Sequence, residues 1–452
     1  MMNNSRQEFQ GGHILIEDGV IRSVDSQPWP QPVDQVIDAA NMVVLPGFVN
    51  THHHLFQSLT RNIPRMQQSQ LFDWLINHYE IWRELTESSL QASSTTALLE
   101  MMKSGVTTSS DHHYLFPRET DGQLIDVEIE VAKTLGIRFQ PTRGSMTLGK
   151  SHDGLPPDDI VQTEEEIFED TERLLDKYHD PREGSMVRIS IAPCAPFNVT
   201  KSQMKHTAEY ASRRNLQIHT HLAETLDEEH YCQTHFNQRP VDFVRELNWI
   251  RGNAWFAHAI HLNDDEVRLF GDHGVGVAHC PSSNLRLGSG IARVKELMQA
   301  GARVSIGVDG TASNDSSNYL AELRNAMMVS RLRPTDCWLT ARDALWLATR
   351  GGAAVLARDD IGSIEVGKRA DLALFSVEGL EYAGALSDPL AALVFTVRMS
   401  PVTHLIVNGE HVIQHGQAKV DEQSVIKRHN QVAEEMLKTA EAKTGIRFRE
   451  TE

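Results

Sequence analysis

PGFVNTHHH, residues 46–54, is the stretch from which the fold of this 452-residue chain is predicted. It begins apolar and ends in three histidines, a pattern typical of a buried strand that carries polar side chains at its carboxyl end. Residues i and i+2 of a strand point the same way, so His52 and His54 can offer two imidazoles to one cation. On its own, an HxH pair is more often a polar strand end than a metal site. The strand that precedes it favours the metal site.

The same pattern recurs along about three hundred residues, between longer stretches with helical spacing. The eight apolar segments are 42–54, 106–113, 137–146, 187–196, 216–224, 254–261, 275–284 and 304–310. Each ends in polar or ionisable residues, so the chemistry collects at the carboxyl ends of parallel strands. Segment 163–178, with Thr163 and Glu166 as a capping box, is typical of a connecting helix. Eight such units predict an α/β protein with a closed (β/α)8 TIM barrel.

Two segments outside the barrel, about 13–41 and 362–417, alternate in the manner of β-strands and contain turn signals such as Asn408-Gly409. We expect them to form one small β-sandwich from both ends of the chain, followed by a helix over 423–443. The predicted domains are 1–45 for the N-terminal part of the sandwich, 46–360 for the barrel, 361–420 for the C-terminal part of the sandwich, and 421–452 for the terminal helix and tail.

The composition excludes several classes of partner. Lys+Arg 43 against Asp+Glu 61 gives a net charge of −18, which repels nucleic-acid phosphates and anionic lipid. No run approaches the ~18 consecutive apolar residues of a membrane helix, and the polar N-terminus has no secretion signal. The four scattered cysteines suit a reducing compartment. We therefore expect a cytoplasmic protein that binds a small molecule and neither nucleic acid nor membrane.

Two further strand ends carry residues that suit metal chemistry. The fifth segment contains His219-Thr220-His221-Leu222-Ala223-Glu224, and Asp309 follows the eighth. His221 and Asp309 are candidate third and fourth ligands, and Glu224 is placed to reach a substrate above the metal. The alternatives are a solvated helix face for the HxxE spacing and a helix N-cap for Asp309. Three histidines and an aspartate at three strand ends together indicate a metal site.

Five motifs, in order and spacing, carry a resemblance to a known family: PGFVNTHHH, HTHLAE, AHAIHL, HCPSSN and GVDG. The chain resembles the amidohydrolase superfamily, specifically its mononuclear aminohydrolases of the cytosine and guanine deaminase type. FQSLTR and RGSMTLGKSHDGLPP are similar to the 8-oxoguanine deaminases within it. The resemblance implies metal ligands His52, His54, His221 and Asp309, and catalytic roles for Glu224, His258 and Asp309.

The resemblance also implies one divalent metal ion. Binuclear relatives need a Lys or Glu at the end of the fourth strand, where this chain has 192–196, APCAP. A thiolate bridge from Cys194 is the alternative, although a small buried side chain explains this cysteine better. Three imidazoles and a carboxylate favour zinc, with iron and manganese as alternatives.

Gln57, Arg143 and His279 are the candidate substrate contacts. Gln57 resembles the family glutamine that binds the pyrimidine edge, and Arg143 can present its fork to a purine carbonyl. The competing interpretations are a loop polar residue for Gln57, an ion pair for Arg143, and support of the metal ligands for His279. His112 and His113 more often have structural roles, and Trp74 and Trp82 are more often core residues than a lid.

The resemblance implies a hydrolase of the C–N bonds of cyclic amidines that converts C–NH₂ to C=O by metal-bound hydroxide. The expected substrate is an oxopurine-like heterocycle, with 8-oxoguanine going to urate and ammonia. Alternatives are deamination of isoxanthopterin, guanine or another amino-heterocycle, a triazine hydrolase and, remotely, a non-catalytic binding protein. A homo-oligomer is expected at the level of the family.

Overall fold

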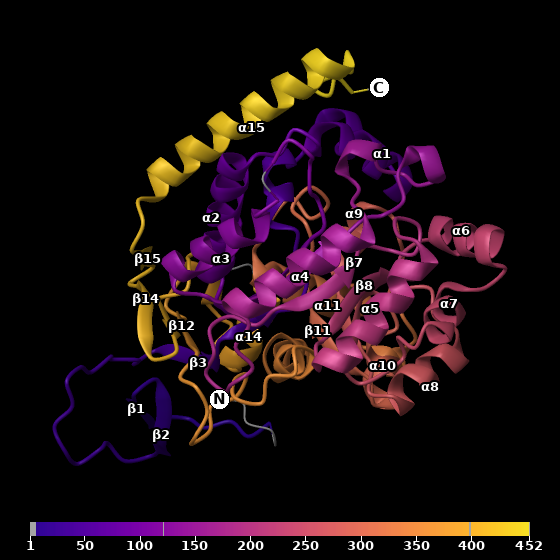
Figure 1. Cartoon of the computed structure of the whole chain (residues 1–452). Helices are drawn as coiled ribbons and strands as arrows, with labels where there is room; N and C mark the ends of the chain where they lie inside the picture. Colours follow the sequence, from indigo (N-terminus) through magenta and orange to yellow (C-terminus); the bar gives the residue numbers. More distant parts are fainter. Residues whose placement is uncertain (1–5, 121, 397–398, 452) are drawn as a thin grey trace.

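The computed structural model describes residues 6–120, 122–396 and 399–451. Its centre is a barrel of eight parallel strands, paired in chain order and surrounded by helices (Figure 1). The strands are β4 (Phe48–Asn50), β5 (Val106–His113), β6 (Arg138–Ser145), β7 (Ser190–Pro193), β8 (Ile218–Leu222), β9 (Ala254–His258), β10 (Gly276–His279) and β11 (Arg303–Ile306). Hydrogen bonds from Thr51 N to Ile306 O (3.3 Å) and from Asp309 N to His52 O (3.1 Å) bring the last strand beside the first. The predicted (β/α)8 barrel is confirmed.

The first predicted segment is two strands rather than one. β3 (Met42–Pro46) pairs with β12 of the small sheet, whereas β4 pairs with β5 of the barrel. Gly47 lies at the change of sheet, and a Cβ there would lie 2.1 Å from Thr107 Oγ1. The expectation of one unit over 42–54 is corrected, because the chain leaves one sheet and enters the other at this glycine.

Helices connect the barrel strands. They are α1 (Leu71–Trp82), α2 (Glu87–Lys103), α3 (Leu124–Leu135), α4 (Glu164–Tyr178), α5 (Lys201–Arg214), α6 (Leu226–Phe236), α7 (Pro240–Glu246), α8 (Asp264–Asp272), α9 (Pro281–Arg286), α10 (Val294–Ala300), α11 (Tyr319–Ser330), α12 (Ala341–Trp346) and α13 (Gly352–Val355). The predicted capping box begins α4, since Thr163 Oγ1 accepts from Glu166 N at 3.2 Å and the Glu166 carboxylate accepts from Thr163 N at 2.7 Å.

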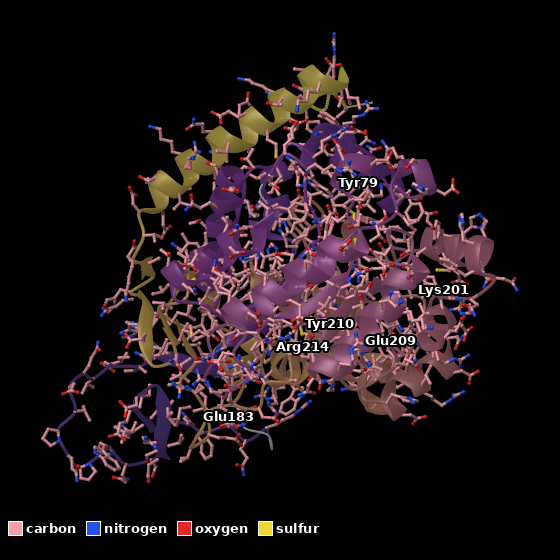
Figure 2. The ribbon with its side chains drawn as sticks, in the orientation of Figure 1. Tyr79, Glu183, Lys201, Glu209, Tyr210 and Arg214 are labelled. Carbon is pink, nitrogen blue, oxygen red and sulfur yellow. The ribbon has the colours of Figure 1, made fainter. Side chains whose placement is uncertain are left out.

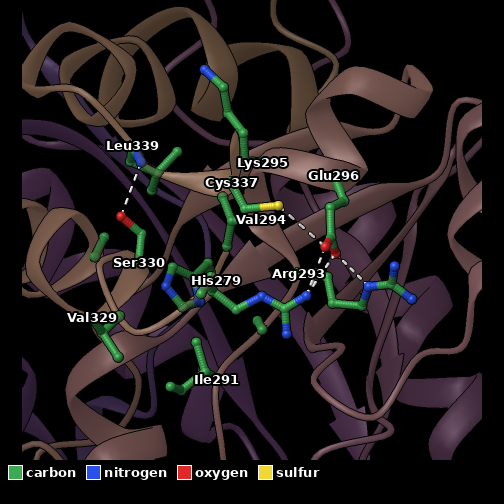
Figure 3. A pocket seen from close by; sticks show the side chains of 13 residues that line it. His279, Ile291, Arg293, Val294, Lys295, Glu296, Val329, Ser330, Cys337 and Leu339 are labelled. Atoms are coloured by element: carbon green, nitrogen blue, oxygen red, sulfur yellow. Dashed lines mark hydrogen bonds and ion pairs between the residues drawn. The ribbon is translucent and has the colours of Figure 1, made fainter. Parts of the chain in front are cut away.

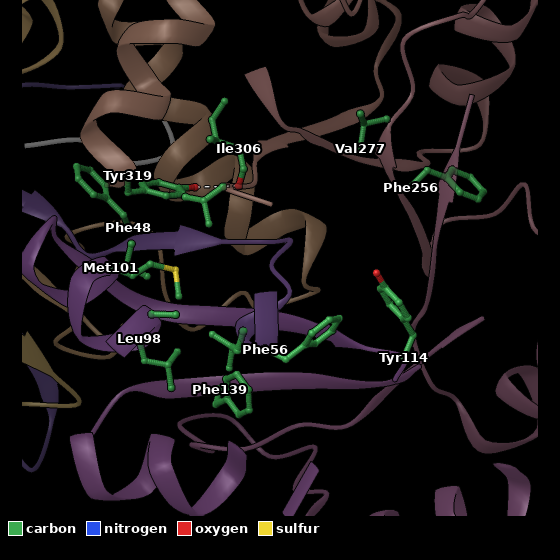
Figure 4. Close-up of a cluster of buried hydrophobic side chains, with 14 of the residues drawn as sticks. Phe48, Phe56, Leu98, Met101, Tyr114, Phe139, Phe256, Val277, Ile306 and Tyr319 are labelled. Carbon is green, nitrogen blue, oxygen red and sulfur yellow. Dashed lines mark hydrogen bonds between the residues drawn. The ribbon is translucent and has the colours of Figure 1, made fainter. Parts of the chain in front are cut away.

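Outward-pointing side chains of the strands pack against these helices (Figure 4). Phe48 of β4 lies 5.6 Å from the ring of Tyr319 in α11. The Tyr319 hydroxyl contacts Val49 O at 2.8 Å and Ile306 O at 2.9 Å. One tyrosine therefore ties the first barrel strand to the last.

The amino end of the barrel is filled, so only the other end is left for chemistry. Val49, Trp255 and Ala278 form an apolar cluster with residues of α13. Backbone carbonyls of α13 accept from Arg303 (2.9 Å to Ala354 O) and Gln217 (2.9 Å to Val355 O), residues at or just before the starts of strands β11 and β8.

Both ends of the chain build the smaller part. A five-stranded antiparallel sheet has the order β15-β14-β13-β12-β3, and a hairpin of β1 (His13–Glu17) and β2 (Val20–Asp25) packs an apolar face on it through Ile21. The further strands are β12 (Leu372–Ser376), β13 (His404–Val407), β14 (Glu410–Gln414) and β15 (Gln417–Ala418). α14 (Pro389–Phe395) precedes the hairpin of β13 and β14.

The predicted terminal helix is α15 (Glu422–Thr444), drawn in yellow in Figure 1, where it runs along α2. His429 of α15 contacts Ser58 O at 3.0 Å, which fixes the helix beside the first crossover of the barrel. Within the described ranges, none of the helices combines the length and the apolar character that a bilayer crossing requires.

Candidate active site and metal centre

Four buried side chains converge at the carboxyl end of the barrel. They are His52 and His54 after β4, His221 in β8 and Asp309 after β11. The Nε2 atoms of His52 and His54 each lie 3.3 Å from Asp309 Oδ1. The distance between His54 Nε2 and His221 Nε2 is 3.1 Å. The structure therefore brings together the four residues that were predicted as ligands.

Backbone carbonyls determine where two of these imidazoles carry their hydrogen. His54 Nδ1 lies 2.8 Å from His112 O, and His221 Nδ1 lies 2.7 Å from Cys194 O. A carbonyl oxygen only accepts, so each Nδ1 is the donor and each Nε2 holds a lone pair. Two lone pairs at 3.1 Å repel each other unless a cation lies between them.

Two successive hydrogen bonds likewise determine which ring nitrogen of His52 carries the hydrogen. His219 Nδ1 lies 2.9 Å from Trp255 O and must donate to it, which leaves His219 Nε2 as an acceptor for His52 Nδ1, also at 2.9 Å. His52 Nε2 is then an unprotonated nitrogen, and no hydrogen-bond partner for it occurs among the described residues. Burial, with the neighbouring His54, lowers the pKa of His221 to about 3, so this imidazole is neutral at pH 7. Three nitrogen lone pairs and one carboxylate fit a divalent metal ion.

His112 is a neighbour that the sequence analysis treated as structural. Its Nε2 donates to Ala192 O at 2.9 Å, and its ring stacks on His221 with centroids 4.9 Å apart. His112 Nδ1 has no partner in the part of the chain described, and one ring nitrogen of His112 lies within 4.8 Å of nitrogens of His52, His54 and His221. His219 was also missed as a supporting residue, although its i, i+2 spacing to His221 placed both on one face of the strand.

Glu224 and His258 face each other beside this group. His258 Nε2 lies 3.5 Å from Glu224 Oε2 and 3.8 Å from Asp309 Oδ2. His258 Nδ1 lies 2.8 Å from Asn284 Oδ1, which only accepts, so the ring donates there and directs Nε2 to the two carboxyl groups. His261 instead donates to Ser289 O at 2.9 Å. Of the two histidines in AHAIHL, His258 is the one at the site.

The carboxyl group of Glu224 is held in a nonpolar environment. Burial, reinforced by the charge of Asp309, raises the pKa of Glu224 well above its ordinary value, which favours the protonated form of this carboxyl group. The backbone at this point is held by Glu228, whose carboxylate accepts from Ala223 N at 2.9 Å and from Glu224 N at 2.8 Å. The carboxyl group of Glu224 is thus held next to the four candidate metal ligands.

The backbone is strained where these side chains leave the strands. Ala223, His258, Ala259 and Asp309 have φ of 51°, 70°, 48° and 63°, in the left-handed region that L-residues disfavour. Strain of this kind is typical of functional sites, where surrounding contacts hold the backbone in place.

Asp309 does not cap a helix. Its Oδ1 accepts from Gly310 N at 2.7 Å, and α11 begins only nine residues later, where Asn318 is the N-cap. The helix-cap alternative considered for Asp309 is therefore wrong.

Gln57 lies at the edge of the site. It is buried in a short 3-10 helix (Leu55–Thr60), and its Nε2 donates to the Tyr114 hydroxyl at 3.3 Å. A Cβ on Gly310 would lie 1.8 Å from Gln57 Oε1, so the amide rests against the backbone next to Asp309. Gln57 is thus adjacent to the candidate metal-ligand group of His52, His54, His221 and Asp309.

The structure does not bring Arg143 into the group. Its Nε pairs with Asp170 Oδ2 at 2.5 Å, Nη2 donates to Gln162 at 2.9 Å, and Nη1 donates to Gly144 O. The guanidinium also stacks on Phe116, 3.9 Å from the ring centroid. The ion-pair interpretation describes this arginine.

His279 points away from the barrel interior. It lines a cavity of about 10 Å³ under α10 and α11, together with Arg293, Glu296 and Cys337 (Figure 3). Such a volume holds about one water molecule. Burial lowers the pKa of His279 to about 3.

Cys194 remains a thiol, and the aromatic residues of α1 are core. Burial raises the pKa of Cys194 to about 12, which disfavours the thiolate that a metal bridge would need. Trp74 and Trp82 are buried with ring centroids 5.4 Å apart.

Comparisons with known proteins agree with this geometry. Residues 43–412 match the model of the amidohydrolase family. The chain is 43% identical to an 8-oxoguanine deaminase of Pseudomonas aeruginosa over 94% of this chain and 95% of that one, and 33% identical to an isoxanthopterin deaminase of an unknown prokaryotic organism over 85% and 83%. The crystal structure of atrazine chlorohydrolase from Arthrobacter aurescens, complexed with zinc, is similar with a TM-score of 0.91, 31% identity, and coverage of 95% of this chain and 97% of that chain. The chain belongs to the amidohydrolase family, whose members are metal-dependent hydrolases.

Proposed function

We propose that this protein deaminates an oxopurine-like heterocycle by hydrolysis, and that the substrate is 8-oxoguanine, which yields urate and ammonia. The observation that carries the proposal is the buried carboxyl group of Glu224, 3.5 Å from His258 Nε2, beside a set of three imidazole lone pairs and one carboxylate. The 43% identity to an 8-oxoguanine deaminase supports the choice of substrate.

One divalent metal ion would be held by His52, His54, His221 and Asp309. When bound, it supplies a Lewis acid that lowers the pKa of water from 15.7 to about 7. The donor set suits zinc, and iron and manganese are the alternatives.

The residues of this chain move the protons. The Glu224 carboxyl donates its proton to the ring nitrogen next to the carbon that is attacked, because negative charge develops there. Asp309 Oδ2 takes a proton from the attacking water. His258 Nε2, 3.5 Å from Glu224 and 3.8 Å from Asp309, lies between the two carboxyl groups and orients the water by a hydrogen bond. Glu224 then takes the proton of the new hydroxyl group, which becomes the C=O, and passes it to the amine, which leaves as ammonia. The proton held by Asp309 returns to Glu224 and restores both groups for the next turnover.

Isoxanthopterin is the second candidate substrate, supported by the 33% identity to an isoxanthopterin deaminase. Its pterin ring, like 8-oxoguanine, has an amino group on a carbon between two ring nitrogens, so the same proton transfers apply. Guanine and aminotriazines need the same machinery, and only the pocket distinguishes them. A non-catalytic relative has no use for a buried Glu224 next to a complete set of candidate ligands.

The deciding experiment measures ammonia release from 8-oxoguanine, guanine, isoxanthopterin, cytosine and aminotriazines, with metal analysis of the same protein. We expect turnover of 8-oxoguanine and about one metal ion per chain. Glu224→Gln should retain the metal and lose activity by about 100-fold or more, because the amide has no acidic proton to donate. A variant with unchanged activity would exclude this mechanism, and turnover of cytosine alone would exclude an oxopurine substrate.

We also propose a cytoplasmic location and a homo-oligomer. The location is supported by Cys194, Cys232, Cys280 and Cys337, all of which are buried and unpaired. Cell fractionation and light scattering of the purified protein test the two proposals separately.

A further inference from the structure

Two buried tyrosine–amide pairs stand beside the metal-ligand group. In the first, Gln57 Nε2 donates to the Tyr114 hydroxyl at 3.3 Å. In the second, Asn198 Nδ2 donates to the Tyr79 hydroxyl at 3.0 Å and approaches Cys194 Sγ at 3.4 Å. The second pair joins α1 to the loop that follows β7, and neither Tyr79 nor Asn198 was singled out by its sequence motif.

Both pairs border the ligands. The ring of Tyr114 lies 5.0 Å from His54 and 6.4 Å from His221. Asn198 reaches the site through Cys194, whose carbonyl accepts from His221 Nδ1 at 2.7 Å.

Each pair has an unused acceptor and an unused donor. Gln57 Oε1 and Asn198 Oδ1 are buried and, within the described residues, have no hydrogen-bond partner. Since each amide nitrogen donates to a phenol oxygen, the phenol hydrogen is left to donate elsewhere. No protein acceptor is found for either phenol hydrogen in the ranges described. Buried polar groups without partners are costly, so both pairs call for a ligand that offers a donor next to an acceptor.

A cyclic amide has this arrangement, because its N–H is adjacent to its C=O. Gln57 is already a candidate substrate contact through the family resemblance. Resting on the proposed function, we propose that Tyr114 completes this contact and that Asn198–Tyr79 binds a second cyclic amide edge, so that the preferred substrate carries at least two. 8-Oxoguanine has such edges on both rings, N1–H with C6=O on the six-membered ring and N7–H or N9–H with C8=O on the five-membered ring, whereas guanine has only the first. An aminotriazine without ring carbonyls has none and would leave both pairs unsatisfied.

The test compares Tyr114→Phe and Tyr79→Phe, which remove one hydroxyl each and keep the ring. Tyr210→Phe is the matched control, since Tyr210 lies on the outer helix α5, well apart from Tyr79 in Figure 2. Binding of urate and of xanthine is measured by calorimetry, because urate keeps the C8=O edge and xanthine lacks it. Gln57→Leu and Asn198→Leu repeat the measurement from the amide side, with thermal unfolding and metal content as checks on folding.

We expect each phenylalanine variant to weaken urate binding by about tenfold, the effect of one hydrogen bond. Xanthine has the N1–C6 edge but no C8=O, so its binding should be weakened only in the variant of the pair that binds the N1–C6 edge. Tyr210→Phe should leave the binding of both ligands unchanged. Equal losses on both ligands in both variants, or no loss in either, would overturn the inference.

Ammonia release from 8-oxoguanine, measured on the same samples, separates the two proposals. If the wild-type protein releases ammonia but the phenylalanine variants bind urate normally, the edge-binding inference fails and the proposed function stands. If urate binding changes as expected while no ammonia appears, the proposed function fails and the inference stands.

Discussion

At the scale of single residues, the proposed metal site depends on hydrogen bonds that orient the histidines. His52 has its Nε2 free only because Trp255 O fixes the tautomer of His219, which in turn accepts from His52 Nδ1. The sequence motif predicted His52 as a ligand from its spacing. It could not predict this chain, because the Trp255 carbonyl comes from a strand that is distant in sequence.

His219→Phe should weaken metal binding by about 10- to 100-fold, the usual effect of losing a hydrogen bond to a ligand. Phenylalanine keeps the stacking on Trp255, where the ring centroids are 4.4 Å apart, so the fold should be retained. Chelator competition for zinc measures the affinity, and His273→Gln on the exposed end of α8 is the control. Unchanged zinc affinity in His219→Phe would show that the ligand is oriented by other contacts.

Gly310→Ala should lower kcat/KM by about tenfold, because its Cβ would occupy the place of Gln57 Oε1, 1.8 Å away. If Gly310→Ala lowers kcat/KM by displacing Gln57, the double variant Gly310→Ala/Gln57→Ala should have the same kcat/KM as Gln57→Ala alone. Steady-state kinetics of the four proteins give this cycle. Additive losses would show that Gly310 acts through its own backbone.

At the scale of elements, alternation along the strands decides which predicted residues reach the site. Ala278 of β10 packs with Trp255 and Val49 on the inner face, so the next residue, His279, must point outward to α10. The alternation of side chains along the strand could therefore have excluded His279 as a substrate contact from the sequence alone. The ion pair between Arg143 and Asp170 of α4 could not have been predicted, because it depends on how that helix packs on the barrel.

The contact between α3 and α4 centres on a carboxylate. Asp126 of α3 accepts from Arg173 (2.6 and 2.9 Å), Lys177 (2.8 Å) and Tyr178 (2.8 Å) of α4. Burial raises the pKa of Asp126, but these hydrogen bonds outweigh it and bring the pKa to about 2, below the ordinary value of 3.8. Because the pKa of Asp126 is lower in the folded state, its ionised carboxylate stabilises the fold fully above about pH 4. This contribution to the free energy of unfolding is lost as the pH falls towards 2.

Asp126→Asn should therefore lower the free energy of unfolding by about 1 kcal/mol at pH 7, a value reduced by the solvent that screens the partly exposed Arg173 and Lys177. Urea unfolding at pH 7, 4 and 3 should show the difference from wild type narrowing below pH 4. Glu130→Gln, which removes an exposed pair with Lys133 on the same helix, is the control and should show no difference. A constant difference at all three pH values would contradict the role of the ionised carboxylate.

At the scale of the whole molecule, a buried ion pair lies where the barrel meets the terminal sheet. The sequence predicted both parts and their origin from the two chain ends. It did not reveal how the two parts attach, because the ion pair between them joins Arg138 and Asp371, which are 233 positions apart in the sequence. Arg138 at the start of β6 binds Asp371 beside β12 through two bonds of 3.0 Å, and both side chains are buried. Asp371 also accepts from Asn408 N at 2.7 Å, and its carbonyl accepts from Gly47 N at 2.8 Å, where the chain changes sheets.

Arg138→Met should lower the free energy of unfolding by about 3–5 kcal/mol, because it leaves a buried carboxylate without its counter-charge. Arg138→Met/Asp371→Leu should recover part of this loss, since it removes both charges together. Metal content should stay at the wild-type value, because β6 begins at the end of the barrel opposite to His52 and His221. Chemical unfolding followed by tryptophan fluorescence and by far-ultraviolet circular dichroism measures the effect, with Arg182→Gln at an exposed ion pair as the control. We expect the two transitions to coincide in the wild type. If this ion pair holds the two parts together, the transitions should separate in Arg138→Met, because the terminal sheet unfolds before the barrel. Coincident transitions in the variant would show that the apolar contacts of Ile21 and the β3–β12 pairing suffice to hold the two parts together.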